Sequence, residues 1–257
     1  MKSALAKSGS AILLLAILTP TIRSAPKSAS QVVCGETKLL TLHKIVVWSV
    51  DGSFFYRAGL AIDADGAPRA YHPNDRLGLD TLAHAGHPGN WGALVTDNEK
   101  PNGTPVVQGA KDPAPGYFVS TTALFDRTNI NSRDPHRYVD AANIPYLVLH
   151  PKALGFAHLG DFATVVNLHN GKISAAIVAD VSAANLPVGE GSIALAEALG
   201  IDSSPRHGGQ DGDVVYVIYP GSGNGRPRKL EEILASSNRL FKAWGGLERL
   251  NACLASE

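Results

Sequence analysis

Two carboxylates lie ten positions apart in the segment ADVSAANLPVGEGS, residues 179–192, and such a pair could carry general acid–base chemistry. Asp180 ends an apolar run, where an ionisable side chain is costly unless it faces a cleft or has partners. Glu190 lies between two glycines at the predicted start of a helix. There the helix dipole would keep it ionised, and the glycines would leave room for a ligand. The alternative is a strand end followed by a helix cap, without a catalytic role.

A second acidic motif lies in the segment IDADGAPRAYHP, residues 62–73. Alternate residues of an extended chain face the same side, so the carboxylates of Asp63 and Asp65 should point together. An Asp-x-Asp-Gly loop could also bind calcium, but Ala67 and Arg69 occupy positions where further ligands are expected. A solvated turn is the remaining interpretation of this motif.

Other polar motifs are weaker candidates. His84 and His87 lack the one-turn helical spacing common among zinc ligands, and the neighbouring Asn90 and Trp91 indicate a surface loop. The glycine-rich run at 221–225 lacks the Lys-Ser/Thr that completes a phosphate loop. We therefore predict no metal site and no organic cofactor.

The elements that would position the carboxylates are mainly strands. Apolar, β-branched runs of strand length recur between turn residues, at 43–50, 54–62, 91–96, 117–125, 144–150, 162–168, 173–179 and 214–219. Asn170 and Gly171 separate two of these runs and predict a hairpin. Because the strands do not alternate regularly with helices, the pattern predicts a mainly β fold with flanking helices (α+β), either a β-barrel or a sandwich.

Helical patterns occur in two places. Residues 191–199 form a short helical pattern that Gly200 closes, and 229–254 carry apolar residues at helical spacing, with a break at Gly245-Gly246. We describe residues 228–254 as a C-terminal helical extension of the domain.

The first residues have the pattern of a secretory signal peptide. Lys2 and Lys7 precede a short apolar run at 11–18, and small residues follow from Ser24. We predict a signal peptide over residues 1–24, cleaved between 24 and 30. One catalytic domain would follow over 31–257, exported to the extracellular space or the periplasm. No later segment approaches the ~20 apolar residues of a membrane helix, so we expect no membrane association after cleavage.

The charge of the mature chain is slightly acidic. The full sequence has 23 basic and 23 acidic residues, and removal of Lys2, Lys7 and Arg23 leaves 20 against 23. This balance argues against nucleic acid as a partner and is compatible with a cationic one. We expect a monomer.

The two cysteines, Cys34 and Cys253, lie near the two ends of the mature chain. In an oxidising compartment they predict a disulfide, which the loop-entropy model values at about 4 to 5 kcal/mol before strain is subtracted. Two buried free thiols are the alternative. A cysteine metal site is excluded by their number and separation.

Five segments together resemble the chitosanases of glycoside hydrolase family 75. In chain order they are IDADGAP at 62–68, DPAPGYFVSTT at 112–122, VVNLHNGKISAAIVAD at 165–180, GEGSIALAEALGI at 189–201 and VVYVIYPGSG at 214–223. The similarity spans about residues 54–223. It implies a small, closed β-barrel of six strands with crossing, double-psi connections. It also implies a secreted enzyme that cuts the β-1,4 bonds of chitosan internally, with inversion at the anomeric carbon.

The resemblance also implies roles for individual residues. The family's catalytic Asp and Glu fall on Asp180 and Glu190, and its Asp-x-Asp-Gly motif falls on Asp63 and Asp65, which we interpret as substrate-binding. An inverting pair lies ~6.5 to 9.5 Å apart, which a strand end and a helix start across a turn could satisfy. The predicted helix start favours Glu190 as the base and Asp180 as the acid.

Three further side chains are predicted to bind substrate. Tyr71 and Trp91 could stack on a sugar face, although core positions would suit both equally. Thr121 offers a hydroxyl in the segment 117–122, where hydroxyls also commonly mark an ordinary sheet surface.

Two other functions stay open. The first is cleavage of another amino-sugar polymer, such as peptidoglycan or chitin. The second is a non-catalytic, secreted carbohydrate-binding protein, against which the presence of both carboxylates argues.

Overall fold

The computed structural model describes Met1 and residues 33–255. Except for Met1, the predicted signal peptide at 1–24 lies outside the described residues. Within the described part, no helix combines the length and the apolar character needed to cross a membrane.

Six strands of the described chain close into a barrel. They are β3 (Ser53–Asp63), β6 (Tyr146–Leu149), β7 (Phe162–Asn167), β8 (Ile173–Val181), β9 (Glu190–Ser192) and β10 (Gln210–Ile218). Around the ring the order is β3-β10-β7-β8-β6-β9, and β9 pairs back to β3. Two more strands, β1 (Thr37–Leu42) and β2 (Ile45–Val50), extend the sheet from β3. The prediction of a mainly β fold with a closed six-stranded barrel is confirmed.

The barrel combines parallel and antiparallel strand pairs. The pairs β6–β8 and β3–β9 are parallel, whereas the other barrel pairs are antiparallel. Parallel neighbours cannot be joined by a tight hairpin and need a longer crossover. When the halves β3-β6-β7 and β8-β9-β10 are exchanged, the same ring of neighbours results. The two halves of the barrel are therefore related by an internal two-fold relation in strand order, and the double-psi form of the connections stays a prediction.

The hairpin predicted at Asn170-Gly171 joins β7 to β8. Val166 pairs with Ile173 across it, and Gly171 has a φ of 71°, which glycine adopts without steric cost. Every residue of β7 is buried, and most of β8 is buried too. Strands covered on both faces are mostly apolar, which is why these two segments lack polar alternation.

The short helix α1 (Ile193–Leu199) follows β9 directly. The Ser192 side chain accepts a hydrogen bond from the main-chain N–H of Leu195 and caps the helix. Gly200 ends it in the left-handed conformation, with a φ of 66°.

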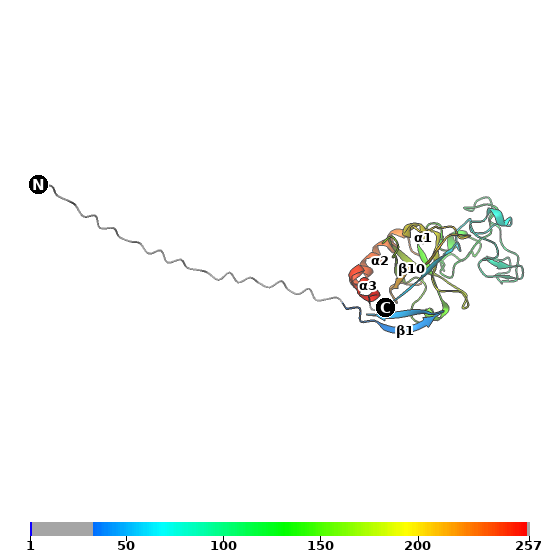
Figure 1. Cartoon of the computed structure of the whole chain (residues 1–257). Coiled ribbons are helices and arrows are strands. Elements are labelled where there is room, and N and C mark those ends of the chain that lie inside the picture. The colour runs from blue at the N-terminus through cyan, green and yellow to red at the C-terminus, as the bar shows by residue number, and fades with distance from the viewer. Residues whose placement is uncertain (2–32, 256–257) are drawn as a thin grey trace. The chain divides into compact units, whose positions relative to one another are not determined.

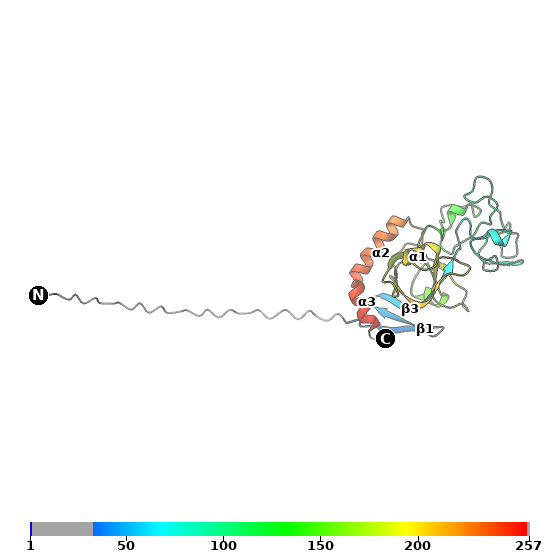
Figure 2. The same ribbon diagram turned by 45° about the horizontal axis from the view of Figure 1, so that its top comes forward.

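The C-terminal extension consists of α2 (Leu230–Trp244) and α3 (Gly246–Leu254), separated at Gly245 as the sequence predicts. α2 packs on β7 and β8. In Figures 1 and 2, α2 and α3 lie along one side of the barrel, whereas the loops between β3 and β6 extend on the opposite side. Cys34 and Cys253 are joined by a disulfide, with Cα atoms 4.6 Å apart, so that prediction is confirmed.

Two predicted strands, 91–96 and 117–125, are wrong. Only Asn90–Trp91 forms a strand here (β5), and it pairs with Gly86–His87 (β4). Elsewhere the two segments are joined by one isolated bridge, between Leu94 and Ser120, and by a few main-chain hydrogen bonds. Prolines and glycines between them stop a regular ladder from propagating, and their apolar side chains pack within the loops instead.

Two smaller features complete the described elements. The predicted strand 43–50 begins only at Ile45, because His43 and Lys44 have positive φ and form the turn between β1 and β2. Short 3₁₀ turns lie at Asp75–Leu77 (η1), Pro135–Arg137 (η2) and Pro151–Gly155 (η3).

Candidate active site

Asp180 and Glu190 are opposite the same residue of the strand between them. β6 lies between β8 and β9, and its Val148 pairs with Asp180 on one side and with Glu190 on the other. Paired residues of neighbouring strands project from the same face of a sheet. All three residues line one pocket of 530 Å³. The fold therefore brings the two carboxylates of the segment 179–192 to one surface.

A β-bulge turns Asp180 toward this surface. Leu147 pairs with Val178, but the next residue of β6, Val148, pairs with Asp180, so Ala179 is the extra residue. Without the bulge, Asp180 would project from the same face as Val178, because residues two apart in a strand share a face. Bulges of this kind commonly re-aim a side chain beside a functional site.

Asp63 and Asp65 face the same pocket from β3. Ala61 pairs with Glu190, and Asp63 lies two residues further along the strand, on the same face. Asp65 follows just beyond the end of β3 and also lines the pocket. Oxygen atoms from the carboxylates of Asp63, Asp65 and Asp180 lie within 4.8 Å of one another. The pocket therefore holds four carboxylates.

Hydrogen bonds fix the position of Asp65. The Tyr71 hydroxyl donates to its Oδ1 at 2.7 Å, and the Tyr146 hydroxyl donates to its main-chain oxygen at 2.9 Å. The main-chain N–H of Asp65 donates to Oδ1 of Asp63 at 2.8 Å. Asp63 and Asp65 are thus held in one fixed arrangement.

The same three aspartates are the residues that could hold a cation. Calcium and magnesium prefer oxygen ligands, and three carboxylates at this spacing offer them. The chain supplies no further side-chain ligand at Ala67 or Arg69, where a calcium loop would continue.

Crowding and burial raise the pKa of all four carboxylates. Burial raises the pKa of Asp63 to about 6 and that of Glu190 to about 8, and the neighbouring acidic groups add to both shifts. The pKa values of Asp65 and Asp180 also lie well above the usual range, first through burial and then through the other carboxylates. Several of these groups therefore keep a proton at neutral pH.

The local setting of Glu190 differs from the sequence prediction. Glu190 does not start a helix: it is the first residue of β9, and α1 begins three residues later. Glu190 is therefore not the N-terminal residue of a helix whose dipole would stabilise its ionised form, and burial raises the pKa of its carboxyl group instead. The local pattern missed this because β9 is defined by pairing with β3 and β6, not by its own composition.

The glycines beside Glu190 also have a different role from the one predicted. A Cβ at Gly191 would lie 2.8 Å from the Tyr146 main-chain oxygen, and one at Gly189 would lie 2.3 Å from that of Gly59. Gly189 also has a φ of 102°. Both glycines permit close packing of neighbouring backbone rather than making room for a ligand.

The other predicted binding residues lie around the site in different ways. Thr121 lines the carboxylate pocket. Tyr71 is 1% exposed, so it acts on the site through its hydroxyl bond to Asp65 rather than through an open ring face. Trp91 lines a neighbouring pocket of 320 Å³ together with Thr121.

The carboxylate pocket adjoins two further pockets. It shares Gly92 and Thr121 with the 320 Å³ pocket. It also shares Asp63, His84 and Glu190 with another pocket of 560 Å³. None of the described residues that line these three pockets belongs to α2 or α3.

Two residues of this region were missed or set aside by sequence reasoning. Asp80 is 3% exposed and lines the 560 Å³ pocket, and His84 lines both that pocket and the carboxylate pocket. Their four-residue spacing is the only local signal, and it lies outside any helical pattern.

A pocket lined by several carboxylates offers the acid and base groups that glycoside hydrolysis requires. The family model of the fungal chitosanases of glycosyl hydrolase group 75 matches residues 113–244, which are 132 of the 257 residues. The chain belongs to this family and is a glycoside hydrolase that acts on chitosan. No curated protein matched the sequence. Asp180 and Glu190 lie inside the matched range, whereas Asp63 and Asp65 precede it.

Proposed function

We propose that this protein is a secreted, endo-acting chitosanase that hydrolyses β-1,4 bonds by an inverting mechanism, with Asp180 and Glu190 as its catalytic pair. The observation that carries the proposal is their common pairing with Val148. Two strand spacings separate their Cα atoms by roughly 9 to 10 Å. An inverting pair of carboxyl groups lies ~6.5 to 9.5 Å apart, which leaves room for the attacking water.

The cluster of acidic groups supports a cationic substrate. Chitosan carries a protonatable amine on each deacetylated unit, and Asp63 and Asp65 face the same pocket as the catalytic pair. A bound ammonium group would favour the ionised form of both aspartates. Such a gain in ionic interaction is not available to an N-acetylated unit.

The adjoining pockets support internal cleavage. The carboxylate pocket shares lining residues with two further pockets, which could hold the sugar units that flank the bond to be cut. A site closed at one end would favour removal of terminal units instead. The disulfide supports export to an oxidising compartment, either the extracellular space or the periplasm. We further propose that the protein functions as a monomer.

The contacts support Glu190 as the general acid and Asp180 as the base, the reverse of the assignment from sequence. Burial and the neighbouring carboxylates raise the pKa of Asp180, whereas the main-chain N–H groups of Ala123 and Val181 donate to its Oδ1 and lower it, which favours the ionised form. No group of the described chain donates a hydrogen bond to the Glu190 carboxyl group, whose pKa burial raises to about 8. Glu190 would therefore keep the proton that the leaving oxygen needs.

This assignment predicts different behaviour of two variants on an activated substrate. On chitosan both Glu190→Gln and Asp180→Asn should be about 10³-fold slower or worse. On a glucosamine oligomer with a dinitrophenyl leaving group, Glu190→Gln should approach the wild-type rate, because that departure needs no acid. Recovery by Asp180→Asn alone would reverse the assignment.

Wild-type kcat/KM on soluble oligomers should fall as pH rises through about 8, where Glu190 loses its proton.

The proposed reaction is tested by product analysis. We expect reducing ends to be released from well-deacetylated chitosan, a rapid fall in mean chain length, and initial products that are α-anomers in a proton NMR time course. Activity should decrease as acetylation rises. Release of β-anomers first would contradict inversion, and activity on murein sacculi but not on chitosan would favour a peptidoglycan hydrolase. Binding of chitosan without cleavage would favour a non-catalytic binding protein.

A further inference from the structure

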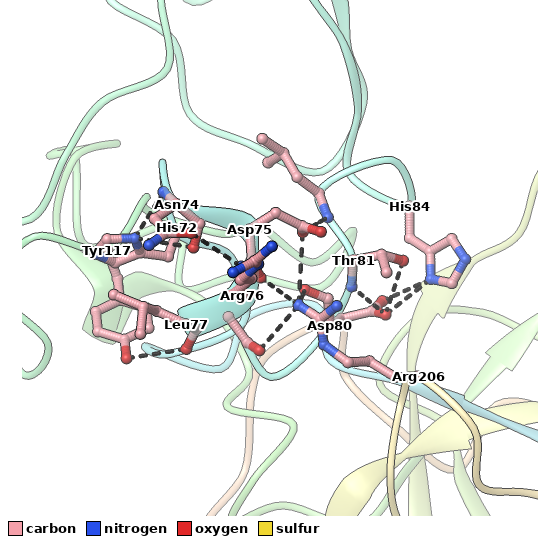
Figure 3. A network of polar contacts seen from close by, with 12 residues as sticks. His72, Asn74, Asp75, Arg76, Leu77, Asp80, Thr81, His84, Tyr117 and Arg206 are labelled. Atoms are coloured by element: carbon pink, nitrogen blue, oxygen red, sulfur yellow. Dashed lines mark hydrogen bonds and ion pairs between the residues drawn. The ribbon is translucent and has the colours of Figure 1, made fainter.

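Asp80 and His84 form a polar pair at the boundary between two pockets. His84 lines both the carboxylate pocket and the adjoining 560 Å³ pocket, and 59% of its side chain is exposed. Its Nδ1 lies 2.9 Å from both carboxylate oxygens of Asp80. Figure 3 shows the His84 ring and Thr81 directed at the buried Asp80 side chain.

The hydrogen bonds of Asp80 determine which nitrogen of His84 faces outward. The main-chain N–H of Thr81 can only donate, so Oδ1 of Asp80 accepts from it, at 2.6 Å. The Thr81 hydroxyl donates to the same oxygen. A carboxylate that accepts from these donors also accepts from Nδ1–H of His84. Neutral His84 therefore carries its proton on Nδ1 and has the Nε2 lone pair free to accept a hydrogen bond.

The loop that carries the pair is anchored. Arg206 donates hydrogen bonds to the main-chain oxygens of Asp75, Gly78 and Asp80, and its guanidinium group also forms an ion pair with Asp75. Figure 3 shows Arg206 beside Asp80 and Asp75. The guanidinium charge is therefore engaged within the protein, and the loop presents the pair in a fixed place.

The surrounding charge favours a cation. Asp63 lines the same two pockets as His84, and Asp80 lies directly behind the His84 ring. His207 lines the 560 Å³ pocket and makes a side-chain contact with Ser204. An acceptor nitrogen backed by a buried carboxylate attracts an ammonium N–H more strongly than an amide N–H.

We infer that His84 is a substrate-binding residue whose Nε2 accepts a hydrogen bond from the C2 ammonium group of a glucosamine unit next to the scissile bond, and that Asp80 is the positioning residue that orients it. This inference rests on the proposed function. It assigns the selection of a deacetylated unit at this subsite to a carboxylate-backed imidazole in addition to the acidic cluster.

The test measures binding in a background that cannot turn over. Every variant carries Glu190→Gln, and calorimetry at neutral pH gives the Kd of the glucosamine hexamer and of the N-acetylglucosamine hexamer. We expect His84→Ala to weaken binding of the glucosamine hexamer about tenfold and binding of the acetylated hexamer less than twofold. His84→Gln should recover most of the loss, because its amide oxygen can occupy the place of Nε2. Asp80→Asn should resemble His84→Ala.

His87→Ala is the matched control, because His87 is exposed and lines none of the three pockets; its Nδ1 contacts only the main-chain oxygen of Pro88. It should leave both Kd values unchanged. An unchanged Kd of the glucosamine hexamer in His84→Ala would overturn the inference and leave the proposed function intact. Equal weakening of binding for both hexamers would do the same. If the Glu190→Gln protein binds neither hexamer although wild type cleaves chitosan, the His84 inference is wrong and the proposed function stands. If wild type does not cleave chitosan either, the His84 inference and the proposed function are both wrong.

Discussion

Glu190→Gln and Asp180→Asn are each expected to lower the rate of reducing-end release from chitosan by about 10³-fold or more, with the fold intact. Removing the acid or the base of a two-carboxylate mechanism removes a proton transfer worth about 10² to 10⁴ in rate. Both side chains line one pocket and are paired with the same residue, Val148. Initial rates at matched enzyme concentration measure the loss. Asp211→Asn, which alters an exposed residue outside the pockets, should keep the wild-type rate.

The stability of the Glu190→Gln variant gives a second readout. The Glu190 pKa is raised from its ordinary value near 4.5 to about 8 in the folded protein, so between these pH values the unfolded chain releases a proton that the folded state retains. The free energy of unfolding therefore falls as pH rises through this window. Gln cannot ionise and is free of this cost. The melting temperature of Glu190→Gln at pH 7 should equal or exceed that of wild type.

A loss of activity together with unchanged or higher stability would identify Glu190 as a functional group that the fold tolerates at a cost. If either variant cut chitosan as fast as wild type, the segment 179–192 would be a strand end and a turn, and the catalytic proposal would be wrong. Loss of activity together with a lower melting temperature would contradict the electrostatic account of Glu190.

Removal of the disulfide is expected to have the largest effect on stability. Cys34 and Cys253 are buried and lie 219 positions apart, so the cross-link closes almost the whole described chain into one loop. The Cys34→Ser/Cys253→Ser double variant should lose about 4 kcal/mol of unfolding free energy. For a domain of this size, that corresponds to a fall of roughly 10 °C in melting temperature. Thermal unfolding followed by circular dichroism measures it.

The controls separate the cross-link from the substitutions. Wild type in a strong reductant should melt close to the double variant, and the reductant should not change the melting temperature of the double variant. Below its melting transition the double variant should retain wild-type kcat, because neither cysteine lines the three pockets of the site. Equal melting temperatures for oxidised wild type and the double variant would show that the cross-link does not stabilise the fold.

The sequence by itself determined the features that depend on neighbouring residues. Asn170-Gly171 specified a hairpin because few residues adopt its backbone conformation at low cost, and Gly200 ended α1 for the same reason. The break at Gly245 between α2 and α3 was equally local. The two cysteines predicted their own pairing because no other cysteine competes. The acidic residues 180 and 190 were recognisable as a candidate pair from type and setting.

Only the tertiary structure decided how those carboxylates are presented. Glu190 lies in a strand because β3 and β6 pair with it from distant parts of the chain, and no local pattern encodes such pairing. The bulge at Ala179 turns Asp180 to the face of Val148, and strand register depends on partners rather than on composition. The sequence placed His84 in a surface loop, but its position beside the pocket follows from Asp80 and the anchored loop. Side-chain type is local information, whereas register and burial, which set direction and pKa, arise from contacts between distant segments.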